Sequence, residues 1–246
     1  MNRNEAASRI MVALDRPDAA SARRLAAALQ GAGCWMKVGM ELFYAAGPDI
    51  VRELKAMGFR VFLDVKMHDI PNTVRGGARS IARLGADMFN VHAAGGMAMM
   101  RAALEGAAEG AAESGGPGAS GLPVIIAVTQ LTSTDQATLN DEIGIPGTVE
   151  DTVVRYARLA RAAGLHGVVA SPLEAAAVKR ACGADFLAVT PGIRPRGADP
   201  GDQRRFATPL DAVRAGADFL VIGRPITAAP DPAAALEHLV EELTQA

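Results

Sequence analysis

Aromatic residues are few in this 246-residue chain, and charges of the two signs are nearly balanced. Only 4% of the residues are aromatic, and 25 Lys and Arg residues against 27 Asp and Glu residues give a formal net charge of -2. Proteins that bind nucleic acids usually carry a basic surface, and those that bind single strands add aromatic side chains on which bases stack. The sequence offers neither feature, so we expect no nucleic-acid partner.

Cysteines are few, and long apolar runs are missing. The two cysteines, Cys34 and Cys182, have no CxxC spacing and no disulfide pattern of a secreted protein, so we interpret both as buried thiols. The first nine residues lack the apolar core of a signal peptide, and no apolar run reaches the roughly 18 residues that a bilayer requires. We therefore expect a cytoplasmic protein that has no membrane partner.

Short apolar segments alternate with longer amphipathic segments along the whole chain, which is typical of β-α units around a buried parallel sheet. The predicted strands are 10–14, 35–39, 60–64, 87–91, 123–128, 167–170, 186–189 and 219–222. The predicted helices are 19–29, 41–57, 72–84, 97–113, 149–163, 173–181, 209–215 and 232–243. Eight such units predict an α/β fold, a single (β/α)8 TIM barrel that forms one domain over residues 1–246.

An open, doubly wound sheet is the alternative for the same alternation. Such a sheet often carries a dinucleotide fingerprint, and a formal G-x-G-x-x-G occurs at Gly116, Gly118 and Gly121. It precedes a predicted strand instead of joining a strand to a helix, so we interpret it as a flexible connector. Two long irregular segments, 129–147 and 191–208, would form binding loops at the carboxyl end of a barrel.

Charged residues collect where the predicted strands end. Asp15 follows the first strand, Lys37 lies in the second, and Asp64, Lys66 and Asp69 occur together in V-F-L-D-V-K-M-H-D. Parallel barrel strands end at one face, so we expect these five side chains to meet there as an active site, with a structural salt-bridge cluster as the alternative. Asp64 and Lys66 are two residues apart, and the strand pleat should point both side chains inward.

Lys66 lies between two acidic residues in the sequence, Asp64 and Asp69. Opposite charges nearby favour the charged form of a lysine. Such a lysine suits the role of a proton donor and electrostatic anchor, whereas a Schiff-base nucleophile needs a neutral amine.

The eighth strand and the segment after the seventh predict a phosphate site. Gly223 would let a ligand approach the backbone, and Arg224 offers a planar fork of donors to a phosphate. Barrels often bind phosphate in the loops after these two strands. Arg194, Arg196 and Gln203 add further polar side chains, although an exposed surface arginine is the alternative for each arginine.

The motif D-V-K-M-H-D-I-P-N-T at residues 64–73 resembles the D-x-K-x-x-D signature and its I-P-N-T extension in the orotidine 5'-phosphate decarboxylase family. The segments A-L-D, K-V-G, Q-L-T-S, P-G-I-R and I-G-R-P-I-T occur in that family's order between residues 13 and 227. The signature is shared with metal-dependent decarboxylases and synthases that act on sugar phosphates. Those relatives carry a glutamate ligand for magnesium where this chain has Lys37, and an ammonium group cannot ligate Mg²⁺.

The resemblance implies decarboxylation of orotidine 5'-phosphate to uridine 5'-phosphate, without a metal or a cofactor. Lys66 would protonate C6 of the pyrimidine as carbon dioxide leaves, and Asp64 would lie near the substrate carboxylate. Asp69 would complete an alternating charge array with Lys37 in the partner subunit of a homodimer, supported by Thr73. The remaining implied contacts are Asp15 and Lys37 to the ribose, Thr132 and Ser133 to the pyrimidine, and Arg194, Gln203, Gly223 and Arg224 to the phosphate.

Two other functions remain open from the sequence. One is a metal-dependent sugar-phosphate decarboxylase or aldolase of the same fold, against which Lys37 argues. The other is an inactive barrel that binds phosphate compounds, which would not need the Asp64, Lys66 and Asp69 set. We interpret His68 and His92 as orienting and packing residues, because no other histidine or carboxylate stands at ligand spacing from them.

Overall fold

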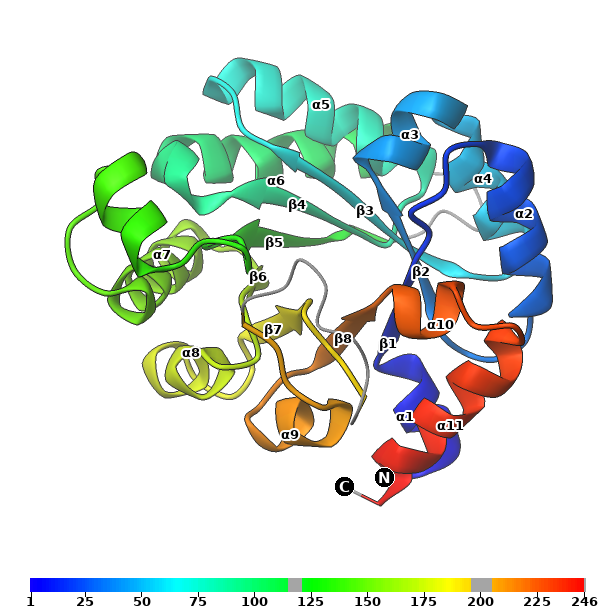
Figure 1. Cartoon of the computed structure of the whole chain (residues 1–246). Coiled ribbons are helices and arrows are strands. Elements are labelled where there is room, and N and C mark those ends of the chain that lie inside the picture. Colours follow the sequence, from blue (N-terminus) through cyan, green and yellow to red (C-terminus); the bar gives the residue numbers. More distant parts are fainter. Residues whose placement is uncertain (115–120, 196–204, 246) are drawn as a thin grey trace.

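Eight parallel strands close into a barrel, and helices surround it (Figure 1). The computed structural model describes residues 1–114, 121–195 and 205–245. The strands are β1 (Ile10–Ala13), β2 (Trp35–Gly39), β3 (Arg60–Met67), β4 (Met88–His92), β5 (Val124–Val128), β6 (Gly167–Val169), β7 (Leu187–Thr190) and β8 (Phe219–Ile222). They pair in chain order, and β1 pairs with β8. The predicted (β/α)8 barrel is therefore confirmed, and the open sheet is wrong.

One of the long predicted helices is divided in the structure. The helices are α1 (Arg3–Ser8), α2 (Ala19–Ala28), α3 (Met40–Ala46), α4 (Asp49–Ala56), α5 (Pro71–Leu84), α6 (Gly96–Glu113), α7 (Val149–Ala163), α8 (Ala175–Cys182), α9 (Pro209–Arg214), α10 (Arg224–Thr227) and α11 (Pro232–Thr244). The single helix predicted over 41–57 is wrong. Gly47 has a φ of 73° and Pro48 follows it, so the chain leaves the helix and restarts as α4.

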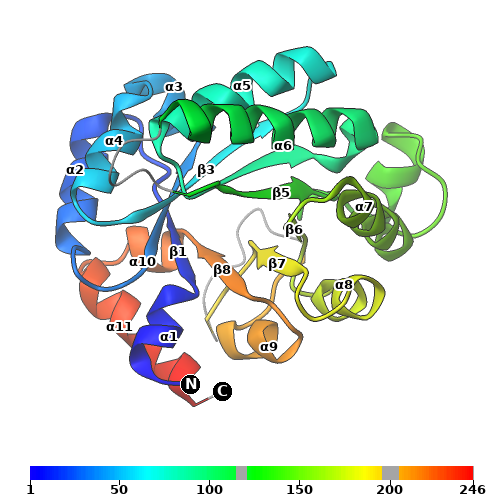
Figure 2. The same cartoon turned by 180° about the vertical axis from the view of Figure 1, so that it is seen from behind.

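Short elements escaped the sequence pattern because they span too few residues to show a period. Helix α1 precedes the first strand and lies beside α11, so that the two ends of the chain lie close together (Figures 1 and 2). Arg3 and Glu237 join these helices at 2.8 Å. Helix α10 follows β8 directly, and a π-helical turn (Thr138–Glu142) lies inside the predicted irregular segment 129–147. Among the described residues, no helix is long and apolar enough to cross a membrane.

An apolar layer fills the inside of the barrel below the strand ends. Its members are Met11, Trp35, Phe62, Met88, Ile126 and Val189. Trp35 is buried, packs edge-on against Phe219 at 5.4 Å and donates its indole N–H to the Ser8 carbonyl. The layer directly precedes charged residues on the same strands, since Lys37 follows Trp35 by two positions and Asp64 follows Phe62 by two. The charged groups therefore lie directly above a packed apolar layer.

Lysine–aspartate pairs fasten the opposite end of the barrel. Asp87 precedes β4, accepts a hydrogen bond of 2.7 Å from the Val61 backbone N–H, and binds Lys55 Nζ at 2.6 Å. The same arrangement recurs half a barrel away with Asp218, Ala188 and Lys179. Each pair links the helix that precedes one strand to the start of the next strand, which holds the strands in register.

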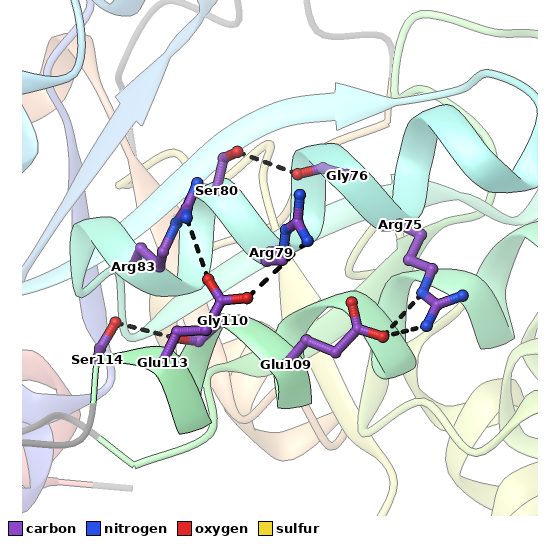
Figure 3. Close-up of polar contacts among 9 residues, drawn as sticks. All are labelled: Arg75, Gly76, Arg79, Ser80, Arg83, Glu109, Gly110, Glu113 and Ser114. Carbon is purple, nitrogen blue, oxygen red and sulfur yellow. Dashed lines mark hydrogen bonds and ion pairs between the residues drawn. The ribbon is translucent and has the colours of Figure 1, made fainter.

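Helices α5 and α6 pack closely against each other. Gly106 and Gly110 of α6 face the α5 backbone, and a Cβ atom on either would overlap the carbonyl group of Arg75 or Arg79. The same helix pair is joined by Arg75 to Glu109, and by Arg79 and Arg83 to Glu113 (Figure 3). The glycines set the separation of the helices, and the exposed ion pairs lie along their shared edge.

We expect Gly106→Ala to lower the free energy of unfolding by about 1–3 kcal/mol, because the new methyl group must push the α5 backbone away. Gly76→Ala is the matched control, since a Cβ at Gly76 in α5 meets nothing within 4 Å. That change should raise the free energy of unfolding by about 0.5–1 kcal/mol through helix propensity. Urea denaturation of the three proteins measures both effects, and a stabilised Gly106→Ala variant would contradict the packing argument.

Candidate active site

A cavity of about 590 Å³ opens at the carboxyl end of the barrel. The residues that line it come from the ends of seven strands or from the loops that follow them: Ala13, Asp15, Lys37, Phe62, Asp64, Lys66, Val128, Gln130, Leu131, Thr132, Ser133, Val169, Pro191, Gly192, Arg194, Val221, Gly223 and Arg224. The cavity walls join apolar side chains to a concentrated set of charges. That combination is typical of a site for a polar small molecule.

Four charged side chains form a continuous array on one side of this cavity. Lys37 Nζ lies 3.0 Å from Asp15 Oδ1 and 3.5 Å from Asp64 Oδ2. Lys66 Nζ lies 2.7 Å from Asp64 Oδ1. The order is therefore Asp15, Lys37, Asp64 and Lys66, with charges that alternate in sign. Asp64 contacts both ammonium groups.

The central lysine of the array, Lys37, is only 6% exposed. Burial acts to lower the pKa of its ammonium group, but the charges of Asp64 and Asp15 outweigh burial and raise this pKa above its ordinary value. Gly39 leaves space for the pair, because a Cβ there would lie 3.1 Å from Lys37 Nζ and 3.2 Å from Asp15 Oδ1. Lys37 is therefore a fixed cation at neutral pH.

The backbone at Lys66 departs from a regular strand. Its φ is 51°, a left-handed conformation that no other described non-glycine residue adopts. The pairing of β3 with β4 shifts register between Leu63 and Met67, which is the mark of a bulge. Asp64 and Lys66 both line the cavity as expected, but the reason that the sequence suggested, the pleat of a regular strand, is wrong. A bulge, not an unbroken pleat, brings both side chains to the cavity.

Asn90 on β4 supports this unusual segment. It is fully buried, its side-chain oxygen accepts from the Lys66 backbone N–H at 2.8 Å, and its Nδ2 donates to Asp64 Oδ1 at 2.7 Å. Sequence reasoning missed Asn90, although a lone polar residue within the apolar strand M-F-N-V-H was a signal. One buried amide thus holds the backbone of Lys66 and the carboxylate of Asp64 together.

Asp69 and Thr73 lie outside the cavity of their own chain. Both are exposed, and Asp69 Oδ1 accepts from the Ile70 backbone N–H at 2.6 Å. The expectation that all five charged side chains meet at one site is therefore wrong for Asp69 within a single chain. The bulge and the start of α5 carry Asp69 away from the cavity, and the lysine that lies between two carboxylates is Lys37.

The other side of the cavity carries the residues predicted for the base and the phosphate. Thr132 is buried there beside Ser133 and Gln130, the last of which sequence reasoning did not single out. Arg194 is buried and donates to the Ile193 carbonyl at 2.9 Å. Gly223 and Arg224 also line the cavity, whereas Gln203 and Arg196 lie outside the described residues.

Two histidine rings lie close to each other beside the site, tilted by 31°. The rings of His68 and His92 lie 5.5 Å apart. The pKa of His92 is lowered, mainly by burial and then by His68 and Lys66, so its ring is neutral at neutral pH. Within 1–114, 121–195 and 205–245, no three His, Cys, Asp or Glu side chains are grouped as metal ligands.

A family model, curated proteins and a solved structure that are similar to this chain all carry the same enzyme name. The model of the "Orotidine 5'-phosphate decarboxylase / HUMPS family" matches residues 8–239. Orotidine 5'-phosphate decarboxylase of Moorella thermoacetica is 55% identical over 243 residues, which cover 99% of this chain and 95% of that protein. The enzyme of the same name from Heliobacterium modesticaldum is 51% identical over 242 residues, or 98% of each chain. The crystal structure of orotidine 5'-phosphate decarboxylase from Lactobacillus acidophilus has a TM-score of 0.84 at 40% identity, and the match covers 95% of this chain and 97% of that chain.

We expect Asp64→Asn to lower the pKa of Lys37, because the nearby negative charge is lost while the burial remains. The chain contains four lysines, so a protein with isotope-labelled lysine gives four NMR side-chain signals to titrate. The signal of Lys55, which is paired with Asp87, is the internal control and should keep its midpoint. An unchanged midpoint for Lys37 would show that Asp64 does not hold its charge.

Proposed function

The chain belongs to the orotidine 5'-phosphate decarboxylase / HUMPS family, and we propose that it converts orotidine 5'-phosphate to uridine 5'-phosphate and carbon dioxide. This reaction is the last step of de novo pyrimidine nucleotide synthesis. The observation that carries the proposal is the array of Asp15, Lys37, Asp64 and Lys66 in a cavity at the carboxyl end of the barrel.

The proposed chemistry uses the charge of Lys66. When the bond between C6 and the carboxylate breaks, its electron pair stays on C6 and carbon dioxide departs. A cation already placed at that carbon stabilises the developing carbanion with little reorganisation. Lys66 then transfers a proton from Nζ to C6, and it recovers a proton from water after the product leaves. No step requires a metal ion or an organic cofactor.

Asp64 and Lys37 act on this reaction through position and charge. The oxygens of Asp64 face Lys37, Lys66 and Asn90, so the carboxylate cannot rotate away from the reacting carbon. We place the substrate carboxylate near Asp64 and the ribose hydroxyls against Asp15 and Lys37. The buried ammonium of Lys37 lies between the two aspartates, 3.0 Å from Asp15 and 3.5 Å from Asp64.

The opposite wall binds the rest of the nucleotide. Thr132 and Ser133 contact the pyrimidine, and Arg194, Gly223 and Arg224 bind the phosphate, together with Gln203 from outside the described residues. The phosphate is remote from C6, so its binding energy can organise the loops around the substrate and be expressed in the transition state.

Lys37 also weighs against a metal-dependent sugar-phosphate enzyme. Its ammonium group lies between the carboxylates of Asp15 and Asp64, where a divalent ion would need both oxygens. A barrel that only binds phosphate compounds would not need charges on the wall that faces away from the phosphate. The array therefore favours decarboxylation over both alternatives.

A homodimer with shared sites is part of the proposal. Asp69 and Thr73 are exposed on the segment after β3, outside their own cavity. Ile70 beside them is 67% exposed, and Tyr44 on α3, which follows the neighbouring strand β2, is 74% exposed. Large exposed side chains on segments that follow adjacent strands suit burial against a second subunit. In that dimer, Asp69 extends the charge array of the partner.

A cytoplasmic location completes the proposal. Cys34 and Cys182 are both buried free thiols, as the sequence predicted. Burial raises the pKa of Cys34 to about 11, so the thiol stays protonated and unreactive. Two unpaired cysteines are in keeping with a reducing compartment.

We expect the purified protein to consume orotidine 5'-phosphate in excess EDTA, and the loss of substrate absorbance measures this reaction.

Lys66→Ala should abolish detectable turnover but leave the affinity for uridine 5'-phosphate within roughly tenfold, because Lys66 acts in the transition state. Lys55→Ala, which removes a lysine at the far end of the barrel, should retain turnover. Activity that disappears in EDTA and returns with Mg²⁺ would refute the proposed chemistry.

We expect two inactive variants to restore activity together. Lys66→Ala and Asp69→Ala homodimers each lack one charge in every site. After subunit exchange, a heterodimer has one intact site and one site with both lesions, so activity should approach half the wild-type value per heterodimer. The matched control is a mixture of Lys66→Ala with Lys37→Ala. Lys37 and Lys66 belong to the same site of one chain, so this mixture must stay inactive.

If heterodimers of Lys66→Ala and Asp69→Ala form and remain inactive, Asp69 acts within its own chain and the shared-site model is wrong. Native mass spectrometry of the mixture establishes whether heterodimers have formed.

A further inference from the structure

One arginine joins three of the loops at the mouth of the barrel. Arg205 lies in the segment after β7, Glu174 immediately precedes α8 in the segment after β6, and Leu131 lies in the segment after β5. The Arg205 guanidinium donates from Nη1 to Glu174 Oε1, and from Nη2 to the Leu131 carbonyl at 2.7 Å. We call this group of three residues the loop bridge.

The ion pair of the loop bridge is largely buried. The side chains of Arg205 and Glu174 are 12% and 6% exposed. Burial raises the pKa of Glu174, and the charge of Arg205 opposes that shift. Arg205 Nε is buried without a hydrogen-bond partner among the described residues. A buried ion pair with an unsatisfied donor stabilises a fold poorly compared with apolar packing, so stability alone does not account for it.

Each end of the loop bridge is joined to a segment that lines the cavity. Leu131 stands between Gln130 and Thr132, and all three line the cavity. On the other side, Ala207 follows Arg205 by two residues and pairs with the segment that carries Arg194. The Arg194 N–H donates to the Ala207 carbonyl at 2.9 Å, and the Ala207 N–H donates to the Gly192 carbonyl at 3.1 Å.

We propose that Arg205, anchored by Glu174, is a positioning residue that fixes the segment 130–133 relative to the segment 191–194. The first segment faces the pyrimidine and the second faces the phosphate, so this proposal rests on the proposed function. Arg205 does not line the cavity. It acts by holding two walls at the separation that one nucleotide spans.

The first experiment compares orotidine 5'-phosphate with orotidine, which lacks the phosphate. Arg205→Ala should lower kcat/KM for orotidine 5'-phosphate by roughly tenfold to a hundredfold, as expected for misplaced binding groups. The loss with orotidine should be much smaller, because no phosphate engages the segment 191–194. Arg205→Lys, which keeps a cation that can reach one acceptor, should recover part of the activity.

A double-mutant cycle tests the role of Glu174. Glu174→Gln should impair the same substrate in the same direction, and the double variant Arg205→Ala/Glu174→Gln should be no worse than Arg205→Ala alone. Arg23→Ala is the matched control, since it breaks an exposed ion pair with Glu53 away from the cavity. That variant should match the wild type with both substrates.

Hydrogen exchange provides a readout that does not depend on turnover. In Arg205→Ala, the amides of Thr134, bonded to the Leu131 carbonyl, and of Arg194, bonded to the Ala207 carbonyl, should exchange faster. Amides of the β1–β2 pair should keep their rates. Equal losses of kcat/KM with both substrates, or unchanged exchange at Thr134 and Arg194, would overturn the proposal. If the wild-type protein does not decarboxylate orotidine 5'-phosphate, the proposed function fails, and the exchange rates still decide whether Arg205 positions the two segments.

Discussion

The carboxylate of Asp64 is the point on which the site depends. It receives the ammonium group of Lys66, the amide of Asn90 and the ammonium group of Lys37, all within 3.5 Å. Charges removed from water are tolerated only when they are paired and hydrogen-bonded. Each member of this cluster therefore requires the others: without Asp64, two partly or fully buried cations would be left close together, and without Asn90 the left-handed backbone at Lys66 would lose its support.

The barrel supports the charged cluster through an apolar layer below it and through ion pairs at the far end. Below the charges, Trp35 and Phe62 belong to an apolar layer that closes the interior. At the far end, Lys55 with Asp87 and Lys179 with Asp218 fasten the starts of the strands. All four lysines of the chain are thus paired with aspartates in positions that matter to the barrel or the site. A compact ammonium group suits such confined pairs, whereas the exposed ion pairs of the outer helices use arginine.

The residues proposed for the chemical step lie at strand ends, whereas those proposed for binding the base and the phosphate lie on loops. The charged array lies at the ends of β1, β2 and β3, where strand pairing holds Lys37 and Asp64 in place and the Asn90 side chain holds the bulged backbone of Lys66. The groups that we propose for binding the base and the phosphate lie on the segments after β5, β7 and β8. Loops can adjust to a ligand in ways that paired strands cannot. The contacts of Ala207 and Arg205 limit that freedom, because they tie the loops to each other and not only to the barrel.

The amino-acid pattern was enough to predict the fold and most of the candidate site. Alternating apolar and amphipathic segments predict β-α units because burial patterns repeat locally, and charged residues at strand ends converge because parallel strands share one edge. Asp15, Lys37, Asp64 and Lys66 could be predicted as neighbours on this ground. The break at Gly47 and Pro48 was also visible in the sequence, although the predicted helix ran through it. Four features could not be predicted from the sequence: the bulge at Lys66, the support from Asn90, the exposed position of Asp69 and the pairing of Arg205 with Glu174. These features depend on strand register and on contacts between distant segments, which exist only once the barrel has closed.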